Sequence, residues 1–371
     1  MEGSAQRPRG AHGLRYGQAG VRGQGDALSA VARRLTPTLR NARVLTRFGH
    51  YAAVVQLADD LALALCTDGV GTKTIVASLL ERFDTIGADC IAMNVNDLIC
   101  VGARPVALVD YIGVHSLDER RIDELLKGLA AAADEAGIAI PGGELAQLPE
   151  IVGSEGDDGA FDLVGSSIGT LHPSELVLGD DIRPGDALIG IASSGIHSNG
   201  LTLARRALLD ESGHDLLEHV AALGRSLGDE LLEPTAIYVR AVLDLWDGGI
   251  STRGLAHITG DGLMNLCRLN PTVGYVLEDL PERPAIFDLI QKAGRVTDEE
   301  MFRVFNMGIG FVVVVPGEES QAALGSISDS GHRAQRIGVV SDEPGVVRIE
   351  PAGLVGTLPS GDGRLVRSAS E

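Results

Sequence analysis

The segment CTDGVGTK, residues 66–73, follows an apolar run that predicts a short buried strand. Gly69 and Gly71 allow the backbone of the turn to approach a ligand closely. Asp68 offers a carboxylate that suits a hard cation such as magnesium, and Lys73 offers a positive charge that suits a phosphate. The same residues also fit an ordinary tight turn with a solvated aspartate and lysine, because short glycine motifs recur by chance. The rest of the chain has to decide between these two interpretations.

The composition is that of a globular protein with two domains of ordinary size. The chain has 371 residues, of which 44% are hydrophobic. It contains no apolar run near the roughly 20 residues that span a bilayer, and residues 1–13 lack the apolar core of a secretory signal. The 4 cysteines show no CxxC spacing, which favours buried thiols in a reducing cytoplasm over disulfides or a metal site. We therefore expect a cytoplasmic protein.

The formal net charge of −20 argues against a general nucleic-acid-binding protein, because such binding requires a basic face. It remains compatible with a phosphorylated small molecule held by a local site. The acidity fits either a salt-adapted source or a GC-rich genome, and composition does not separate the two. Lys73 is conspicuous, because it is one of only three lysines, with Lys127 and Lys292.

Apolar strands alternate with amphipathic helices in both halves of the chain, which predicts an α/β or α+β architecture. The turn-rich, charged stretch at 172–184 predicts a domain boundary. We expect a disordered segment over 1–15, an N-terminal domain over 16–172, a C-terminal domain over 173–350 and a tail over 351–371.

Two helices have recognisable ends. Asp118 predicts the N-cap of an amphipathic helix that closes at Gly137. Ser198 or Asn199 predicts the N-cap of a second helix that extends to about Leu209. The polar, acidic stretch over 210–230 predicts a long surface connection after it.

Three further groups of polar residues suggest chemistry. Asp97 follows Asn96 near the end of an otherwise apolar helix, where it needs either a salt-bridge partner or a shared magnesium ion with Asp68. Glu144 in PGGELAQ fits equally well a turn glutamate and a site residue. His197 lies among Ser194, Ser198 and Asn199 ahead of a helix N-terminus, where an anion can bind. A lone loop histidine is more often structural than catalytic.

Two weaker glycine motifs, HITGDG at 257–262 and FNMGIG at 305–310, complete the set. The chain lacks GxxxxGK[ST], GxGxxG between a strand and a helix, and HExxH. Walker-type nucleotidases, Rossmann dehydrogenases and zinc proteases are therefore disfavoured.

Seven segments occur in the order found in one family: CTDGVGTK, FDTIGADCIAMNVNDLICVGARPVALVDY, PGGELAQLP, SSGIHSNGL, LLEPTAIYV, GLAHITGDG and DEEMFRVFNMGIGF. The chain resembles the phosphoribosylformylglycinamidine cyclo-ligases, also called aminoimidazole ribonucleotide synthetases, over residues 16–350. The segment RFGHYAAVV is more similar to archaeal-type members than to the glycine-richer version of many bacteria.

The resemblance implies a fold of two α/β domains, with the N-terminal sheets of two subunits paired into a barrel across a homodimer. It implies ATP in the cleft between the domains, magnesium, and ring closure of formylglycinamidine ribonucleotide in purine synthesis. No nucleic acid or membrane is implied as a partner.

The resemblance also implies roles for individual residues. Magnesium would be held by Asp68 and Asp97, and catalysis would involve His197, Asp97 and Lys73. The nucleotide would meet Asp68, Gly69, Gly71, Thr72, Lys73, Asn96, Asp97, Gly102 and Glu144. The substrate would meet Ser194, His197, Ser198, Asn199 and Thr259.

Three positions depart from the pattern of the family. Arg22 stands where an aspartate is usual, Leu145 replaces the threonine of GGET, and Asp261 replaces a glycine of TGGG. These departures bear on activity, and a non-catalytic nucleotide-binding paralogue is one alternative. Another is a different ATP-using member of the superfamily: selenophosphate synthetase, thiamine-phosphate kinase or hydrogenase-maturation dehydratase. The first would need an N-terminal cysteine and the last a C-terminal cysteine, and residues 1–60 and the final RSASE contain none.

Overall fold

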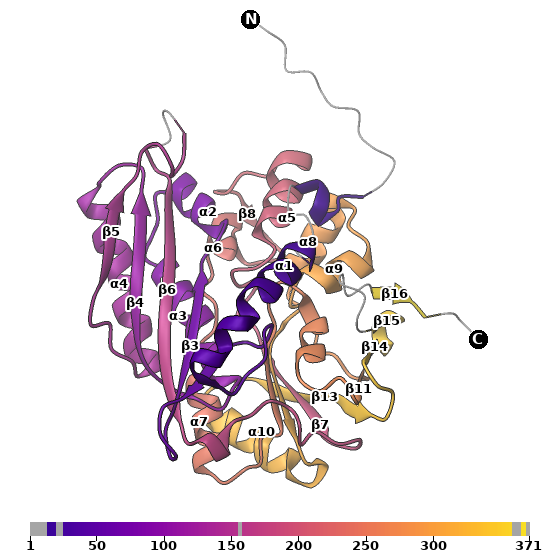
Figure 1. Cartoon of the computed structure of the whole chain (residues 1–371). Helices are drawn as coiled ribbons and strands as arrows, with labels where there is room; N and C mark the ends of the chain where they lie inside the picture. The colour runs from indigo at the N-terminus through magenta and orange to yellow at the C-terminus, as the bar shows by residue number, and fades with distance from the viewer. Residues whose placement is uncertain (1–12, 20–24, 155–157, 358–364, 369–371) are drawn as a thin grey trace, which may run out of the picture.

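The computed structural model describes residues 13–19, 25–154, 158–357 and 365–368. These residues form two sheets with helices packed against them, so the expected α/β architecture is confirmed (Figure 1). Arg22 and the expected disordered residues 1–12 lie outside the described residues. Among the described residues, no helix is both long and apolar enough to cross a membrane.

The N-terminal sheet has six strands in the order β1-β2-β3-β6-β4-β5, and only the pairing of β4 with β5 is parallel. The strands are β1 (Arg43–Val44), β2 (Ala53–Gln56), β3 (Ala62–Gly69), β4 (Arg104–Val114), β5 (Gly143–Gln147) and β6 (Phe161–Leu171). Its helices are α2 (Lys73–Leu80), α3 (Ile86–Ile99) and α4 (Glu119–Ala136), preceded in the chain by α1 (Gly25–Leu35).

The two faces of this sheet differ in burial. Alternate residues of β3 and β6 are buried on the face that α3 covers, and α4 packs outside α3. The opposite face carries exposed apolar side chains, including Leu65 at 41% and Val109 at 45% exposure. Antiparallel sheets commonly leave one face open, but large apolar side chains on that face point to a further contact.

The C-terminal sheet has eight strands in the order β10-β12-β7-β13-β11-β14-β15-β16. They are β7 (Ala187–Ala192), β10 (Gly254–His257), β11 (Gly274–Leu277), β12 (Ile309–Val315), β13 (Ala334–Ser341), β14 (Val346–Ile349), β15 (Leu354–Thr357) and β16 (Leu365–Arg367). A separate pair is formed by β8 (His219–Val220) and β9 (Arg225–Ser226).

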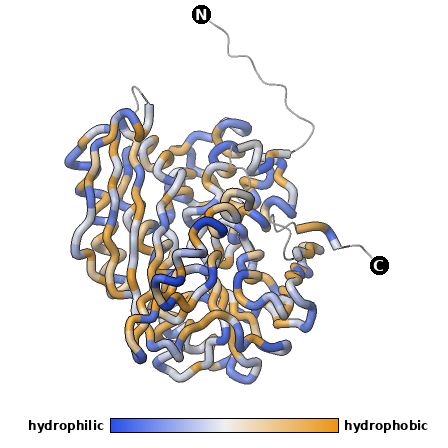
Figure 2. Tube along the Cα trace, in the orientation of Figure 1, coloured by the Kyte–Doolittle hydropathy of each residue, from blue (hydrophilic) through white to orange (hydrophobic). Residues whose placement is uncertain are grey.

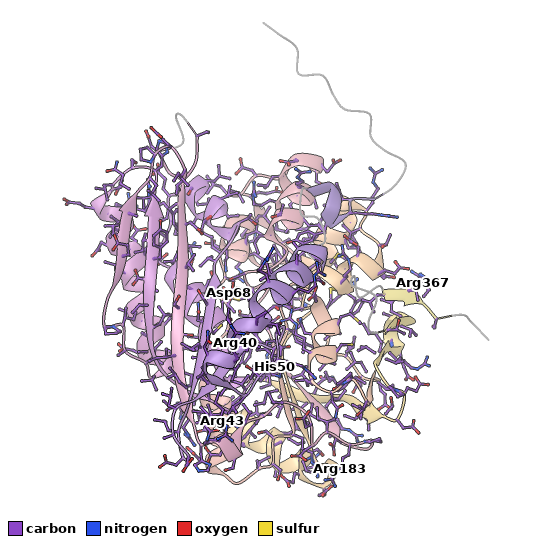
Figure 3. The ribbon with its side chains drawn as sticks, viewed as in Figure 1. Arg40, Arg43, His50, Asp68, Arg183 and Arg367 are labelled. Carbon is purple, nitrogen blue, oxygen red and sulfur yellow. The ribbon has the colours of Figure 1, made fainter. Side chains whose placement is uncertain are left out.

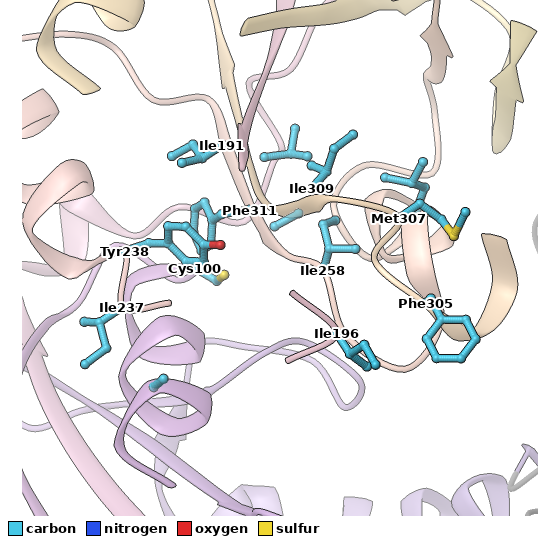
Figure 4. Close-up of a cluster of buried hydrophobic side chains, with 14 of the residues drawn as sticks. Cys100, Ile191, Ile196, Ile237, Tyr238, Ile258, Phe305, Met307, Ile309 and Phe311 are labelled. Atoms are coloured by element: carbon cyan, nitrogen blue, oxygen red, sulfur yellow. The ribbon is translucent and has the colours of Figure 1, made fainter. Parts of the chain in front are cut away.

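The helices of this domain are α5 (Leu201–Arg205), α6 (Leu227–Leu231), α7 (Val239–Asp247), α8 (Ala285–Gly294), α9 (Asp298–Val304) and α10 (Ser320–Asp329). Every residue of β12 is buried, as its continuous apolar run predicts. Hydrophobic and hydrophilic stretches alternate along the chain in both domains (Figure 2). Tyr238 and Phe311 lie in the same core, with ring centroids 5.3 Å apart (Figure 4). The core therefore continues from β12 to the segment that faces the N-terminal domain.

The predicted ends of one helix are confirmed, and the predicted start of another is wrong. Asp118 caps α4, because its side chain accepts a hydrogen bond from Arg121 N at 3.0 Å, and Gly137 closes the helix in the left-handed conformation. The expected cap of α5 is wrong: Gly200 occupies the N-cap with a φ of 82° and has no side chain to donate or accept.

Two predictions about irregular segments are also wrong. The expected surface connection over 210–230 contains β8, β9 and most of α6, because Leu227 and Leu231 are buried against the domain. The expected tail over 351–371 contains β15 and β16, which extend the sheet through antiparallel pairing, and Leu354 is 1% exposed. The strands in both segments are short, and the sequence around them is mostly polar. Its composition therefore does not indicate strands.

Candidate functional site at the domain junction

Asp68 lies at the end of β3, where the strand turns into α2, and is labelled near the centre of the molecule (Figure 3). Its Oδ1 accepts a hydrogen bond from Gly69 N at 2.8 Å. Gly71 has a φ of +68°, a conformation that glycine adopts without strain. The Thr72 hydroxyl lies 2.9 Å from the hydroxyl of Thr202 in α5, so the turn contacts the C-terminal domain.

Asp97 comes from α3 and receives a hydrogen bond from the C-terminal domain. His257, at the end of β10, is fully buried, and its Nδ1 lies 2.9 Å from Asp97 Oδ1. The Cys66 thiol lies 3.8 Å from Asp97 Oδ2. Asp97 therefore faces the interdomain junction from the helix, as Asp68 does from the neighbouring strand.

Asp68 and Asp97 repel each other. Burial, together with the charge of Asp97, raises the pKa of Asp68 to about 6, although the hydrogen bond from Gly69 opposes the shift. Two carboxylates in this relation favour a cation between them. Among the described residues, no group of three or more His, Cys, Asp or Glu side chains gathers to hold a metal. A two-carboxylate site fits magnesium, which completes its octahedron with phosphate oxygens and water.

Asn96 is fully buried and ties α3 to the segment 235–238. Its Oδ1 accepts from Tyr238 N at 2.9 Å, and its Nδ2 donates to Ala236 O at 2.9 Å. Both the oxygen and the nitrogen of the Asn96 side chain therefore form hydrogen bonds across the domain junction. Its expected contact with a nucleotide is not supported by this placement.

Lys73 points away from the turn. Its side chain is fully buried, and its Nζ lies 2.7 Å from Asp89 Oδ2 and donates to Glu233 O at 2.5 Å. Because the ammonium group is held in a buried ion pair, this placement does not support the expected direct contact with phosphate, which stays a prediction. Only the backbone of the turn and Asp68 remain on the ligand side of this motif.

His197 lies in the loop between β7 and α5 with a φ of +66°, which is unusual for a residue with a side chain. Its Nε2 accepts a hydrogen bond from Ser194 N at 3.2 Å, so the proton of the neutral ring is assigned to Nδ1. Burial lowers the pKa of His197 well below its usual value, and the nearby His257 and Lys73 act in the same direction. Within the described residues its Nδ1 has no hydrogen-bond partner, so the ring offers one unused donor.

The other expected substrate residues lie in this loop or beside it. The Ser194 hydroxyl donates to Pro234 O at 2.5 Å, and Ser198 donates to Asp89 Oδ1 at 3.0 Å. A Cβ built on Gly260 would lie 3.6 Å from Asn199 Nδ2, so Asn199 adjoins the turn after β10. Thr259 in that turn donates its backbone N–H to Asn265 Oδ1 at 2.7 Å. The structure thus brings the 193–200 loop and the 257–262 turn together.

The departure at Asp261 has a simple structural explanation. Asp261 has a φ of −101°, which does not require glycine, and it pairs with Arg268 at 3.0 Å. Gly262 is the position that needs glycine, because its φ is +55° and an added Cβ would lie 2.0 Å from Phe302 O. The extra negative charge is therefore accompanied by a nearby positive one.

Glu144, Leu145 and Gly102 lie away from the two carboxylates. β5 is the edge strand, separated from β3 by β6 and β4, and exposed Glu144 pairs in register with Tyr111. Leu145 is 44% exposed on the same strand. Gly102 lies in the turn after α3 with a φ of +83°, and an added Cβ would lie 2.3 Å from Glu175 O, so chain packing accounts for this glycine. Within one chain, neither Glu144 nor Gly102 joins the site.

The sequence interpretation assigned no role to His257 or Asp89. Asp89 carried the same signal as Asp97, a carboxylate on an apolar helix that needs a partner. His257 was present only inside a weak glycine motif, and nothing local indicated that its ring faces Asp97.

Comparisons with known proteins agree with this arrangement. The models for AIR synthase related protein match residues 49–171 with the N-terminal domain and 183–350 with the C-terminal domain. A phosphoribosylformylglycinamidine cyclo-ligase of Methanothermobacter thermautotrophicus is 46% identical over 323 residues, covering 87% of this chain and 92% of the relative. One of Thermococcus gammatolerans is 51% identical over 306 residues, covering 82% and 86%. The chain belongs to the phosphoribosylformylglycinamidine cyclo-ligase family.

The expected family is thus confirmed. Solved structures show that this cyclo-ligase fold extends to more distant proteins. A thiamine-monophosphate kinase from Stenotrophomonas maltophilia has a TM-score of 0.59 and 21% identity, covering 87% of this chain and 96% of the kinase. PurL of T. maritima complexed with FGAR has a TM-score of 0.57 and 16% identity, covering 86% of this chain and 48% of PurL. At these identities the likeness concerns the fold alone.

Proposed function

We propose that this chain catalyses the ATP-dependent ring closure of formylglycinamidine ribonucleotide to aminoimidazole ribonucleotide, releasing ADP and phosphate. Membership of the cyclo-ligase family supports the reaction. The observation that carries the proposal is structural: Asp68 and Asp97 face the same junction that His257 and the His197 loop enter from the other domain. A nucleotide and a second substrate would meet there.

The proposed reaction consists of two displacements. The formyl-amide oxygen attacks the γ-phosphorus of ATP, and ADP leaves. The amidine nitrogen then attacks the activated carbon, the carbon–oxygen bond breaks, and phosphate leaves with that oxygen while the nitrogen loses a proton. Both steps depend on holding the reacting atoms in attack geometry, which a closed junction between two domains provides.

Asp68 and Asp97 would hold magnesium, which when bound neutralises charge on the phosphates. His257 fixes the orientation of the Asp97 carboxylate through its Nδ1–H. His197 stays neutral because its pKa is low, so it acts as a hydrogen-bond donor and does not carry a positive charge. Its unused Nδ1–H suits an oxygen that gains charge during the reaction.

We also propose that the chain forms a homodimer through the open face of the N-terminal sheet. Leu65, Val109 and Tyr111 are exposed on this face at 41%, 45% and 37%, and Leu65 pairs in register with Ile168. Contiguous exposed apolar side chains mark interaction sites, and a two-fold dimer buries the same face of both copies. Exposed Glu144 lies on the edge strand of this sheet and would adjoin the second copy.

The function is tested with purified protein, formylglycinamidine ribonucleotide, magnesium and ATP, at low and at high salt. We expect aminoimidazole ribonucleotide and ADP in equal amounts. A folded protein that forms no aminoimidazole ribonucleotide under either condition would contradict the proposal.

A further inference from the structure

A buried ion pair with its hydrogen-bond donors lies beside the site and is not used by the proposed chemistry. Asp89 of α3 and Lys73 of α2 are both fully buried, and Lys73 Nζ lies 2.9 Å from Asp89 Oδ1 and 2.7 Å from Oδ2. Both residues belong to the N-terminal domain. The remaining hydrogen bonds to Asp89 come from the C-terminal domain.

Those donors are Ser198 and Thr235. Asp89 Oδ1 accepts from Ser198 Oγ at 3.0 Å, from Thr235 Oγ1 at 2.6 Å and from Thr235 N at 2.8 Å. The two hydroxyls also lie 3.0 Å from each other. Asp89 therefore receives three hydrogen bonds across the domain junction in addition to its ion pair.

The energetics of such a cluster argue for a positional role. Taking two charges out of water costs about as much as their attraction returns, so a buried ion pair is weak evidence for stability. Apolar residues of similar volume would fill the same space. What they would not provide is a fixed acceptor for Ser198 and Thr235.

The cluster fixes one end of the loop that carries His197. Ser198 follows His197 directly, and His197 holds a left-handed backbone conformation, which costs energy unless its surroundings enforce it. The other end of the loop is held by Asn306, which accepts from Ser193 Oγ at 3.1 Å and donates to Gly195 O at 2.9 Å. Ile196 between them packs into the apolar core (Figure 4).

The same helix also carries Asp97, the proposed magnesium ligand. Asp89 and Asn96 are seven residues apart, so they lie on one face of α3 about two turns from each other. Asn96 binds the segment 235–238, and Asp97 receives the hydrogen bond from His257. Helix α3 thus contacts the His197 loop through Asp89, the segment 235–238 through Asn96 and the end of β10 through Asp97.

We propose that Asp89, charge-balanced by Lys73, is a positioning residue that locks the His197 loop in register with the carboxylates of the nucleotide site. This inference rests on the proposed function. It assigns Asp89 no contact with substrate, and it explains why Lys73 is buried in a motif that otherwise faces the ligand.

The test removes one hydrogen bond and leaves the charges in place. Thr235→Val keeps the shape of the side chain and the backbone donor but loses the hydroxyl, while Thr235→Ser keeps the hydroxyl. The matched control is Thr252→Val, which removes the acceptor of the Trp246 Nε1 hydrogen bond at the opposite end of β10 from His257.

We expect T235V to lower kcat about tenfold, because the reacting groups are misplaced, with less than about a twofold change in the KM for ATP. T235S should recover most of this loss. Amide hydrogen exchange should speed up over residues 193–200 in T235V and remain unchanged there in T252V.

A double variant separates positioning from stability. Lys73→Met with Asp89→Leu replaces the ion pair by apolar side chains, which should leave the melting temperature within a few degrees of the original. We expect kcat to stay low in this variant, because Ser198 and Thr235 have lost their acceptor.

The outcomes are distinct. If the unmodified protein forms aminoimidazole ribonucleotide and T235V matches T252V in both kcat and exchange over 193–200, the positioning role is wrong. A K73M/D89L variant with full kcat would also overturn it. If the unmodified protein forms no product, the proposed function fails instead, and faster exchange of the loop in T235V alone would still support the structural lock.

Discussion

His257 Nδ1 lies 2.9 Å from Asp97 Oδ1, and this hydrogen bond joins β10 of the C-terminal domain to α3 of the N-terminal domain. Because His257 is fully buried, the position of Asp97, a proposed magnesium ligand, depends on how the two domains are packed. Residues that orient a metal ligand typically change metal affinity by 10–100-fold when they are lost.

The first prediction concerns this hydrogen bond. His257→Leu should raise the magnesium concentration needed for half-maximal turnover by about tenfold or more, because Asp97 loses its orienting donor. His257→Asn places an amide N–H near the position of Nδ1 and should recover part of the loss. Magnesium titrations of both variants measure the effect, with melting temperature as the control for folding. Equal magnesium dependence in all three proteins would mean that His257 does not orient Asp97.

Asp68→Asn should abolish turnover and stabilise the protein in the absence of magnesium. Turnover should fall at least about 100-fold, because a cation ligand is lost. The stability of the magnesium-free protein near pH 7 should rise by on the order of 2 kcal/mol, because the cost of burying the Asp68 charge and its repulsion from Asp97 both disappear. Denaturant unfolding with and without magnesium tests both parts. Unchanged turnover would show that the turn after β3 is not part of the site.

The raised pKa of Asp68, about 6, predicts a specific pH dependence. The folded state of the magnesium-free protein binds this proton more tightly than the unfolded state, whose aspartate titrates near 3.8. The resulting stability is present below the unfolded value and is lost as the pH rises through 6. The stability difference between Asp68→Asn and the unmodified protein should therefore grow between pH 4 and pH 7.

Magnesium binding should show the opposite trend. Protons compete with the cation for Asp68, so the apparent affinity should fall about tenfold per pH unit below 6. Calorimetric titration with magnesium and a non-hydrolysable ATP analogue at pH 5 and pH 7.5 measures this. An affinity that is equal at both pH values would rule out Asp68 as a ligand.

The pairing of Asp261 with Arg268 at 3.0 Å predicts how the unusual TGDG turn behaves. Asp261→Gly should preserve kcat, since the backbone at this position does not strain either residue. It should lower the KM for the ribonucleotide by a few-fold, because Arg268 is freed to interact with a phosphate. Steady-state kinetics measure both kcat and the KM for the ribonucleotide. A loss of kcat would mean that Asp261 takes part in the chemistry.

The open face of the N-terminal sheet predicts a charge-sensitive dimer. Leu65→Asp should convert the dimer to a monomer, because a buried unpaired carboxylate is costly. Leu217→Asp is the matched control, since Leu217 is 78% exposed in the other domain. Light scattering after size-exclusion chromatography measures the mass. An unmodified protein that is already monomeric, or a dimeric L65D variant, would contradict the proposed interface.

The sequence was most informative where local pattern and tertiary role coincide. The α/β order, the α4 caps and the pair Asp68 and Asp97 follow from apolar periodicity and from carboxylates in apolar surroundings. The burial of Lys73 could not be predicted, because a glycine turn and a lysine suggest phosphate whether the side chain points outward or inward. Its direction depends on Asp89, sixteen residues away and on another helix.

Other features depend on long-range pairing that no local pattern encodes. β15 and β16 exist because β14 offers them an edge, and His257 matters because β10 ends opposite α3. Glu144 lies in a motif of the right composition, but the strand order puts it three strands from Asp68. Whether a residue of such a motif lies near the site depends on the spatial order of the strands in the sheet.

The measurement that tests the central claim most directly follows one oxygen atom. Formylglycinamidine ribonucleotide labelled with ¹⁸O at the formyl group is incubated with the protein, magnesium and ATP, and the phosphate released is analysed by mass spectrometry. If the formyl oxygen attacks ATP and leaves with the phosphoryl group, each aminoimidazole ribonucleotide formed is matched by one phosphate that carries the label. Unlabelled phosphate, or ATP consumption without ring closure, would contradict the account.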